Sequence, residues 1–329
     1  MEIRKHSWRI EHAHDGVRLD HFLANALPLA LQREVSRAQI RRLIMAGAVA
    51  RNGRRERIAS YVLRAGMRVD AVVDVARLDT GGATGLRRPI TKEFAWTPER
   101  VLFEDRWLIV VDKPAGLPTQ PTLDPARASV FGTLQEYLRQ RDGADAYLGL
   151  HHRLDRDTSG VLLFTKDKQA NAGVTELFAG RGVAKTYFAL AMAGAAPAPD
   201  TWEVSNHLGI VDRVGKSNRF GAVRSGGDPA QTGFLVWERL AGAVLVEAKP
   251  HTGRTHQIRV HLAEGGHPIF GDTLYGGAAE WRPARGAPVP IPRVMLHAAQ
   301  LAFTHPLTGE PLKVRAQLPA DFADCLARR

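Results

Sequence analysis

The chain has 329 residues, of which 44% are hydrophobic and 24% charged, a balance typical of folded globular proteins. The single cysteine, Cys325, excludes an internal disulfide and a thiolate metal cluster, and it fits a reducing compartment. A formal net charge of +11 predicts a polyanionic partner, either a nucleic acid or a lipid surface. No apolar segment reaches the ~20 residues that a membrane-spanning helix needs. Without a secretion signal either, we expect a cytoplasmic protein that does not associate with membranes.

The length of the chain predicts two domains, and residues 1–75 have the pattern of a small one. Apolar residues recur at helical spacing over residues 19–27, and a capping box that begins at Ser36 predicts a second helix over residues 37–46. Asn52-Gly53 then predicts the tight turn of a β-hairpin. We therefore expect two helices followed by strands.

Most of the positive charge lies between residues 31 and 68, which contain ten arginines, two acids and no lysine. Arg33, Arg37 and Arg41 recur every four residues and can share one face of the predicted helix. Many such runs are only solvated surfaces, but the use of arginine alone favours bidentate recognition of phosphate. We expect this face to bind RNA or DNA, with Arg37 and Arg41 as candidate contacts.

The layout resembles the alpha-L RNA-binding module first described in a ribosomal protein. Arg18-Leu19-Asp20, the helix that follows Ser36 and the Asn52-Gly53 turn carry the resemblance. It implies that residues 1–75 form a small α/β RNA-binding domain. Residues 76–98 lack periodicity and are rich in helix-breaking residues, a pattern that predicts a flexible linker.

Residues 99–329 are predicted to form a second domain dominated by strands. Short runs of β-branched and aromatic residues recur, and the helical patterns are too few to alternate regularly with them. The strand-like runs are residues 108–111, 161–164, 186–190, 234–237 and 243–246, and the helical patterns cover residues 130–139 and 168–179. We expect an α+β fold with a large mixed, mostly antiparallel sheet.

The densest polar segment, His151 through Gly160, runs directly into an apolar strand. A polar loop at the mouth of a strand is well placed for catalysis. Arg153 and Arg156 flank Asp155 and would keep its carboxylate ionised, as a nucleophile or a base requires. Taken alone, the segment also fits an ordinary turn whose arginines pair with its acids.

A second polar cluster, residues 250–262, contains three histidines, two arginines and a glutamine. Its alternating apolar residues fit a strand, whereas Thr252 as a cap and Gly265-Gly266 as a stop fit a helix, which we favour. The histidines recur every five residues and share no face of a helix or strand, so we predict no metal site. A serine hydrolase that uses Ser159 is an alternative, although no G-x-S-x-G elbow frames this serine.

Together these segments resemble the pseudouridine synthases of the RluA type over residues 99–320. The motifs that carry the resemblance are Asp112-Lys113-Pro114-Ala115-Gly116, His152 through Gly160, Lys185-Thr186-Tyr187, Gly253 through Leu262, Gly271-Asp272-Thr273-Leu274-Tyr275-Gly276, Leu296-His297-Ala298 and His305-Pro306. The resemblance implies that Asp155 is the catalytic carboxylate and that Tyr187 stacks on uracil. It also implies that Arg259 forms an ion pair with the aspartate.

The resemblance implies an isomerase that needs no cofactor. Such an enzyme breaks the bond between ribose and uracil nitrogen 1, rotates the uracil and rejoins it through carbon 5. The carboxylate could attack the anomeric carbon or remove a ribose proton. Candidate contacts to the RNA are Lys113, Arg153, Arg156, Arg254, His256, Gln257 and Ile258. Two positions depart from the family pattern, because His151 stands where an apolar residue is usual and Asp228 where a lysine is usual.

The attached alpha-L module favours large-subunit ribosomal RNA as the substrate. We also expect a monomer. Transfer RNA is the alternative substrate. The alternative function is that of a noncatalytic RNA-binding or ribosome-assembly factor on the same fold.

Overall fold

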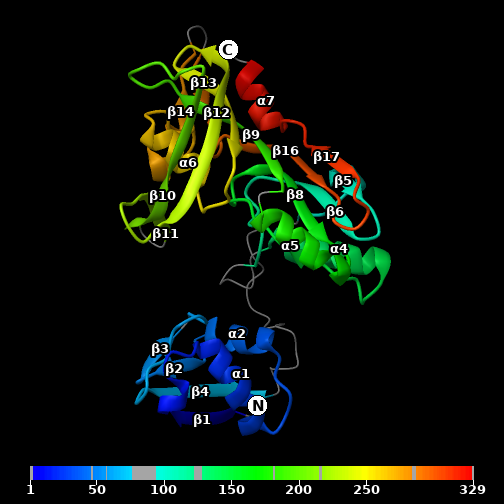
Figure 1. Cartoon of the computed structure of the whole chain (residues 1–329), viewed down its shortest axis with the longest axis vertical. Helices are drawn as coiled ribbons and strands as arrows, with labels where there is room; N and C mark the ends of the chain where they lie inside the picture. The colour runs from blue at the N-terminus through cyan, green and yellow to red at the C-terminus, as the bar shows by residue number, and fades with distance from the viewer. Residues whose placement is uncertain are drawn as a thin grey trace. The chain divides into compact units, whose positions relative to one another are not determined.

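The computed structural model describes residues 3–45, 47–56, 58–75, 94–121, 128–180, 182–214, 217–283 and 287–327. They divide into two compact units, one formed by residues up to 75 and the other by residues from 94 onward (Figure 1). Each unit has its own apolar core. None of the described helices is long and apolar enough to cross a membrane.

The first unit packs two helices against a four-stranded antiparallel sheet with the strand order β1-β4-β2-β3. Its elements are β1 (Ile3–Arg9), the 3-10 helix η1 (His12–His14), α1 (Leu19–Leu31), α2 (Arg37–Met45), β2 (Val49–Arg51), β3 (Arg54–Glu56) and β4 (Arg68–Asp74). Leu23 and Leu27 of α1 meet Ile40 and Ile44 of α2 in the core, above Val69 of β4. Spacings of four residues place each pair on one helix face.

Local signals in the sequence fix the helices and the hairpin of this unit. The backbone N–H of Ser36 donates to Gln39 Oε1 at 2.7 Å, and the N–H of Gln39 donates to Ser36 Oγ at 3.3 Å, which completes the capping box. Asn52 and Gly53 have φ angles of 44° and 78°, as a tight primed turn requires. The two predicted helices and the hairpin are confirmed. Strand β1, which pairs with β4 along its whole length, was not predicted.

The second unit begins before the predicted boundary at residue 99. Residues 76–93 of the predicted linker lie outside the described residues. Phe94 and Trp96, however, pack on the core of the second unit. Trp96 is only 7% exposed, and its Nε1 donates to Thr133 Oγ1 at 2.9 Å. Burial of these two rings makes residues 94–98 part of the second unit and not of a linker.

The second unit is built on one eleven-stranded sheet of order β11-β10-β12-β13-β9-β16-β8-β6-β5, with β17 beside β16 and β7 beside β8. Its elements are η2 (Pro98–Arg100), β5 (Val101–Glu104), β6 (Leu108–Lys113), α4 (Val130–Asp142), β7 (Gly149–Leu150), β8 (Ser159–Thr165), η3 (Lys168–Ala170), α5 (Asn171–Ala179), β9 (Ala184–Met192), β10 (Thr201–Val214), β11 (Ser217–Ala222), β12 (Asp228–Leu240), β13 (Ala243–Pro250), α6 (Gln257–Glu264), η4 (Thr273–Tyr275), β14 (Glu280–Trp281), β15 (Val289–Pro290), β16 (Leu296–Thr304), β17 (Pro311–Arg315) and α7 (Ala320–Ala327). Among the described pairs of this sheet, β8 with β16 is parallel and the others are antiparallel. The predicted α+β fold with a mixed, mostly antiparallel sheet is confirmed.

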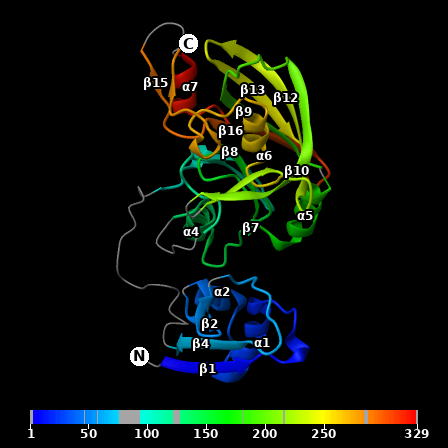
Figure 2. The ribbon, with the colours of Figure 1, turned by 90° about the vertical axis from the view of Figure 1, so that its left-hand side faces the viewer.

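Strands β6 and β8 are buried on both faces, which explains their continuous apolar sequences. Leu134 of α4 packs in one cluster with Ile109, whereas Val174 of α5 packs in another with Val110, the next residue of β6. Successive residues of a strand point to opposite faces, so the two helices cover opposite sides of the sheet. Figure 2 shows them in this arrangement. The polar loop of residues 151–158 leads into this enclosed strand β8.

The opposite end of the sheet carries α6 and α7. Ile258 and Leu262 of α6 lie in one apolar cluster with Phe234 of β12, and Phe322 of α7 joins the same cluster. The second polar segment of the sequence is therefore anchored by its apolar residues. Gln257 and Arg259 of the same helix line the pocket described below.

Gly160 in β8 allows the one parallel contact among the described strands of the sheet. It has a φ of 112°, and a Cβ there would lie 2.1 Å from the carbonyl oxygen of Ala298 in β16. A residue with a side chain would therefore meet backbone that cannot move without opening the sheet.

We predict that Gly160→Ala lowers the free energy of unfolding by more than ~3 kcal/mol, because the methyl group must separate β8 from β16. Urea denaturation measures the loss. The matched control is Gly309→Ala, at a φ of 75° with nothing within 4 Å of the added Cβ, which should cost only about 1–2 kcal/mol. Equal losses in the two variants would contradict the steric explanation.

Candidate active site

The loop of residues 151–158 is held by the ammonium group of Lys113 at the end of β6. The side chain is fully buried, and Nζ donates to three backbone carbonyl oxygens, those of Pro114, Arg156 and Thr158, at 2.9, 2.9 and 2.6 Å. Burial lowers the pKa of Lys113 to about 7. The prediction that Lys113 contacts RNA is wrong, because backbone oxygens enclose its ammonium group. Lys113 instead positions the loop.

Thr119 holds the same loop on the other side of Asp155. Its Oγ1 donates to the carbonyl oxygen of Leu154 at 2.7 Å and accepts from the N–H of that residue at 3.1 Å. The N–H of Thr158 donates to the carbonyl oxygen of Asp155 at 3.2 Å, which closes a turn. The turn that the sequence pattern allowed is therefore present. It presents Asp155 to solvent and does not merely reverse the chain.

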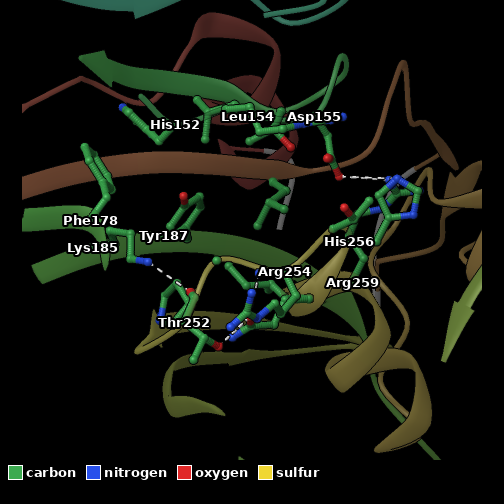
Figure 3. Close-up of a pocket in the computed structure, with 18 of the residues that line it drawn as sticks. His152, Leu154, Asp155, Phe178, Lys185, Tyr187, Thr252, Arg254, His256 and Arg259 are labelled. Atoms are coloured by element: carbon green, nitrogen blue, oxygen red, sulfur yellow. Dashed lines mark hydrogen bonds and ion pairs between the residues drawn. The ribbon is translucent and has the colours of Figure 1, made fainter. Parts of the chain in front are cut away.

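Asp155 lines an open pocket of about 480 Å³ (Figure 3). The walls come from segments far apart in the chain, namely the loop of residues 151–158, strand β9 and the residues that lead into α6. The predicted site residues that line the pocket are Arg153, Asp155, Tyr187, Arg254, His256, Gln257, Ile258 and Arg259. The fold thus brings the two polar clusters of the sequence to one site.

The second polar cluster forms helix α6, as favoured, but the helix begins at Gln257 and not near Thr252. Thr252 donates its hydroxyl to Gln257 Oε1 at 2.7 Å, and Gln257 Nε2 donates to the carbonyl oxygen of Gln231 at 2.9 Å. The amide of Gln257 is buried in these bonds. The prediction that this amide binds RNA is therefore corrected, because it shapes the wall of the pocket instead.

Arg259 is the electrostatic centre of the site. Its Nη1 donates to Asp155 Oδ2 at 3.0 Å, while Nε and Nη2 donate to the two carboxylate oxygens of Asp272 at 2.6 and 2.8 Å. Burial alone would lower the pKa of the Arg259 guanidinium, but the bonds to Asp272 and Asp155 outweigh it and raise the pKa. The predicted ion pair is present, and the carboxylate of Asp155 is fixed beside a permanent cation.

Tyr187 lies on β9, between Asp155 and the far end of the pocket (Figure 3). Its ring is half-buried and packs against two apolar clusters of the sheet. Burial, and then the charge of Asp155, raise the pKa of the Tyr187 phenol. The hydroxyl stays protonated, and the ring is placed to offer an aromatic surface to a planar ligand.

The end of the pocket away from Asp155 is basic and partly aromatic. Lys185 Nζ donates to the carbonyl oxygen of Thr252 at 2.9 Å, and burial lowers the pKa of Lys185 to about 8 (Figure 3). His152 stacks on Phe178 with ring centroids 4.3 Å apart, and burial lowers the pKa of His152 to about 3. This end combines one cation with a neutral stacked ring pair, a combination suited to a nucleotide.

Other predicted contacts have more limited roles. Arg156 is exposed and pairs with the neighbouring aspartate at 2.9 Å, outside the residues that line the pocket. Ile258 lines the pocket as an apolar wall and is only 6% exposed. Arg37 and Arg41 belong to the first unit, where both are exposed and Arg41 Nε also contacts the buried Asp20 at 3.3 Å.

Asp272 and Tyr275 are parts of the site to which the sequence analysis gave no role. Both lie in the motif from Gly271 to Gly276, where Gly271 has a φ of 77° and a Cβ would lie 1.8 Å from a backbone oxygen. The Arg259 guanidinium lies over the Tyr275 ring, 5.1 Å from its centroid. Periodicity carries no signal for such residues, and only the motif itself marked this segment.

Ser159 is not available as a nucleophile. It is 2% exposed, and its Oγ lies 2.9 Å from Nδ1 of His297, whose pKa burial lowers to about 4. A substrate carbonyl cannot reach this hydroxyl. The serine hydrolase alternative is therefore excluded.

Comparison with known protein families matches residues 107–264 to RNA pseudouridylate synthase and residues 17–69 to the S4 domain. Ribosomal large subunit pseudouridine synthase C of Vibrio vulnificus (strain CMCP6) is 34% identical over 309 residues, which cover 92% of this chain and 90% of that protein. The chain belongs to the RNA pseudouridine synthase family. Its predicted N-terminal RNA-binding module is confirmed as an S4 domain.

Other relatives agree with this membership. Ribosomal large subunit pseudouridine synthase C of Escherichia coli (strain K12) is 34% identical over 320 residues, 95% of this chain and 93% of that protein. Among solved structures, human RNA pseudouridylate synthase domain containing 4 aligns with a TM-score of 0.55 and 29% identity, over 70% of this chain and 92% of that chain. The predicted fold and the predicted isomerase, which converts uridine to pseudouridine, are confirmed.

We predict that Asp272→Asn lowers the free energy of unfolding by about 3 kcal/mol, because it removes the charge that compensates the buried Arg259. The matched control is Asp142→Asn, which also breaks a two-oxygen pair, with Arg141 at 2.6 and 2.8 Å, but one whose two side chains are 35% and 34% exposed. That loss should be about 1 kcal/mol or less. Urea denaturation compares the two, and a smaller loss for Asp272→Asn would contradict the anchoring role.

Proposed function

We propose that this pseudouridine synthase modifies uridines of large-subunit ribosomal RNA and that Asp155 is the carboxylate that acts on the ribose. The observation that carries the assignment is the position of Asp155, in the pocket and bound to Arg259, which Asp272 locks in place. Relatives that match nearly the whole chain are named ribosomal large subunit pseudouridine synthase C, which supports ribosomal over transfer RNA.

The reaction begins when the target uridine leaves the RNA stack, at a cost of a few kcal/mol that stacking and phosphate contacts offset. Tyr187 stacks on the uracil, and Arg153 and Arg254 at the pocket supply positive charge for the phosphates. Ile258 adds the apolar wall that a flipped base requires. The pocket of about 480 Å³ is large enough to bury a nucleoside.

Asp155 then acts on the ribose by one of two routes. It attacks the anomeric carbon, or it removes a ribose proton, and in either route the bond to uracil nitrogen 1 breaks. Arg259 binds Oδ2, so Oδ1 is the oxygen for the ribose. The released uracil turns within the pocket, and carbon 5 bonds to the anomeric carbon. In the first route the bond from Asp155 to that carbon breaks at this point, and in the second the proton on Asp155 returns to the ribose. The proton on carbon 5 is replaced by one on nitrogen 1, so composition is unchanged and no energy source is consumed.

The first unit binds RNA outside the pocket, through the exposed arginines of α2. Arg37 and Arg41 are four residues apart on this helix, a spacing that suits two neighbouring phosphates. We place this function in a cytoplasmic monomer, and a chain with a single cysteine, Cys325, fits a reducing compartment.

We predict that Asp155→Asn binds unmodified ribosomal RNA normally but converts uridine at least about a thousandfold more slowly, because an amide is neither nucleophile nor base. Pseudouridine is quantified by mass spectrometry of digested RNA. The control is Asp157→Asn in the same loop, whose carboxylate pairs with exposed Arg156 and should matter little. Near-normal conversion by Asp155→Asn would show the catalytic assignment to be wrong. Conversion of transfer RNA alone would refute the substrate, and no conversion of any RNA by the native protein would favour a noncatalytic factor.

We predict that the double change Arg37→Gln and Arg41→Gln makes the slope of log K against log salt concentration shallower by about 1.5–2, because two phosphate contacts no longer release counterions. Fluorescence anisotropy of labelled ribosomal RNA measures the slope. A control that removes the same charge, Lys5→Gln with Arg9→Gln, lies on β1 of the same unit. If both pairs change the slope equally, overall charge and not α2 is responsible.

A further inference from the structure

His256 is held in an uncommon backbone conformation beside Asp155. It has a φ of 57° immediately before α6, one of three non-glycine residues with positive φ among the described part of the chain. This left-handed conformation costs an ordinary residue about 1–2 kcal/mol, and such strain concentrates at functional sites. It directs the ring toward the side of the pocket that holds Asp155 and Arg259 (Figure 3).

The hydrogen bonds of Tyr275 define which nitrogen of His256 carries the proton. The N–H of Phe220 donates to the Tyr275 hydroxyl oxygen at 3.0 Å, and His256 Nδ1 lies 2.9 Å from the same oxygen. Since that oxygen already accepts from Phe220, its own proton is available for Nδ1. The geometry assigns Nδ1 as an acceptor and leaves the proton of the neutral ring on Nε2.

The protonated Nε2 faces a position that substrate atoms can fill. It lies 3.8 Å from Asp155 Oδ2, too far for a hydrogen bond. Burial has the largest effect on His256 and lowers its pKa. The charges of Asp155 and Asp272 act in the opposite direction, and those of Arg259 and Arg153 act in the same direction. The ring is therefore neutral at pH 7. A substrate group that lies against the Asp155 carboxylate can accept a hydrogen bond from the N–H at Nε2.

We propose that His256 donates a hydrogen bond from Nε2 to a carbonyl oxygen of the uracil while the bond between nitrogen 1 and the ribose breaks, and that Tyr275 is the positioning residue that fixes this tautomer. Breaking the bond puts negative charge on the uracil, which spreads onto its carbonyl oxygens. A fixed neutral donor stabilises that charge without transferring its proton, so no charge or atom is gained. This inference rests on the proposed function of Asp155.

The same contacts tie this donor to the β10–β11 hairpin. Phe220 belongs to β11, and its ring meets that of His256 edge to face, with centroids 5.6 Å apart. Arg219 of the same strand lies over the ring of Tyr275, the hydrogen-bond partner of His256, at 6.0 Å from the ring centroid. The tautomer therefore depends on a hairpin that lies outside the catalytic loop.

The test compares two unbranched replacements of equal length. His256→Gln keeps an N–H donor where Nε2 stands, whereas His256→Met fills similar space without one. We expect His256→Met to lower kcat on unmodified ribosomal RNA about a hundredfold, the usual loss for one such donor, with KM changed less than about threefold. His256→Gln should recover at least a tenth of the native kcat. Equal kcat values in the two variants would overturn the proposal.

A second measurement does not depend on turnover or on the stability of these variants. In nitrogen-15 correlation spectra of the full chain, His256 should show the tautomer protonated at Nε2, and Tyr275→Phe should shift it toward a mixture. A ring protonated at Nδ1 in the native protein would overturn the assignment. Failure of the proposed function is separate, because there the native protein itself would form no pseudouridine and Asp155→Asn would change nothing.

Discussion

The geometry of the site depends on one buried guanidinium held between two carboxylates. Arg259 is 8% exposed, and such a cation is tolerated only where its charge and its donors are satisfied. Asp272 satisfies two donors from the η4 segment, and Asp155 satisfies a third from the loop before β8. The loop before β8 is thereby joined, through a single side chain, to two segments that lie more than a hundred residues further along the chain. The carboxylate of Asp155 is placed by the same bonds that make the burial of Arg259 possible.

The backbone around Asp155 is fixed differently, by side chains that donate hydrogen bonds to the carbonyl oxygens of the loop. The Lys113 ammonium contacts two of them, those of Arg156 and Thr158, and the Thr119 hydroxyl contacts a third, that of Leu154. An irregular loop cannot satisfy its own carbonyl groups as a helix or sheet does, so a buried donor must. Lys113 therefore fixes the backbone beside Asp155 and needs no contact with a substrate to do so.

Features set by neighbouring residues could be predicted from the sequence. The capping box at Ser36, the Asn52-Gly53 turn and the continuous apolar strands β6 and β8 each rest on local rules and were predicted. Strand β1 was missed, because most of its residues are basic or polar and show no strand pattern, and its partner β4 lies about sixty residues further along the chain.

The residues of the site also fall into two groups, those that the sequence could indicate and those that only the fold reveals. Asp155, Tyr187 and Arg259 came from resemblance in ordered motifs, whereas the turn pattern around Asp155 by itself favoured nothing more than a turn. The burial of Lys113 and Gln257 could not be predicted, since both are polar and polar residues are usually exposed. The role of Asp272 can be recognised only in the folded chain, where its Oδ2 lies 2.6 Å from Arg259 Nε.

The enclosure of β8 between two helices has a consequence for motion. Amide groups in a strand covered on both faces exchange with solvent only when the whole domain opens, whereas β10 and β11, largely exposed along their length, belong to the part that opens locally. Asp155 is therefore attached to the most protected region of the domain. Phe220, which contacts His256 and Tyr275 on the other side of the pocket, belongs to one of the least protected regions. The two sides of the pocket should therefore open with different free energies, and Asp155 lies on the side that costs more to open.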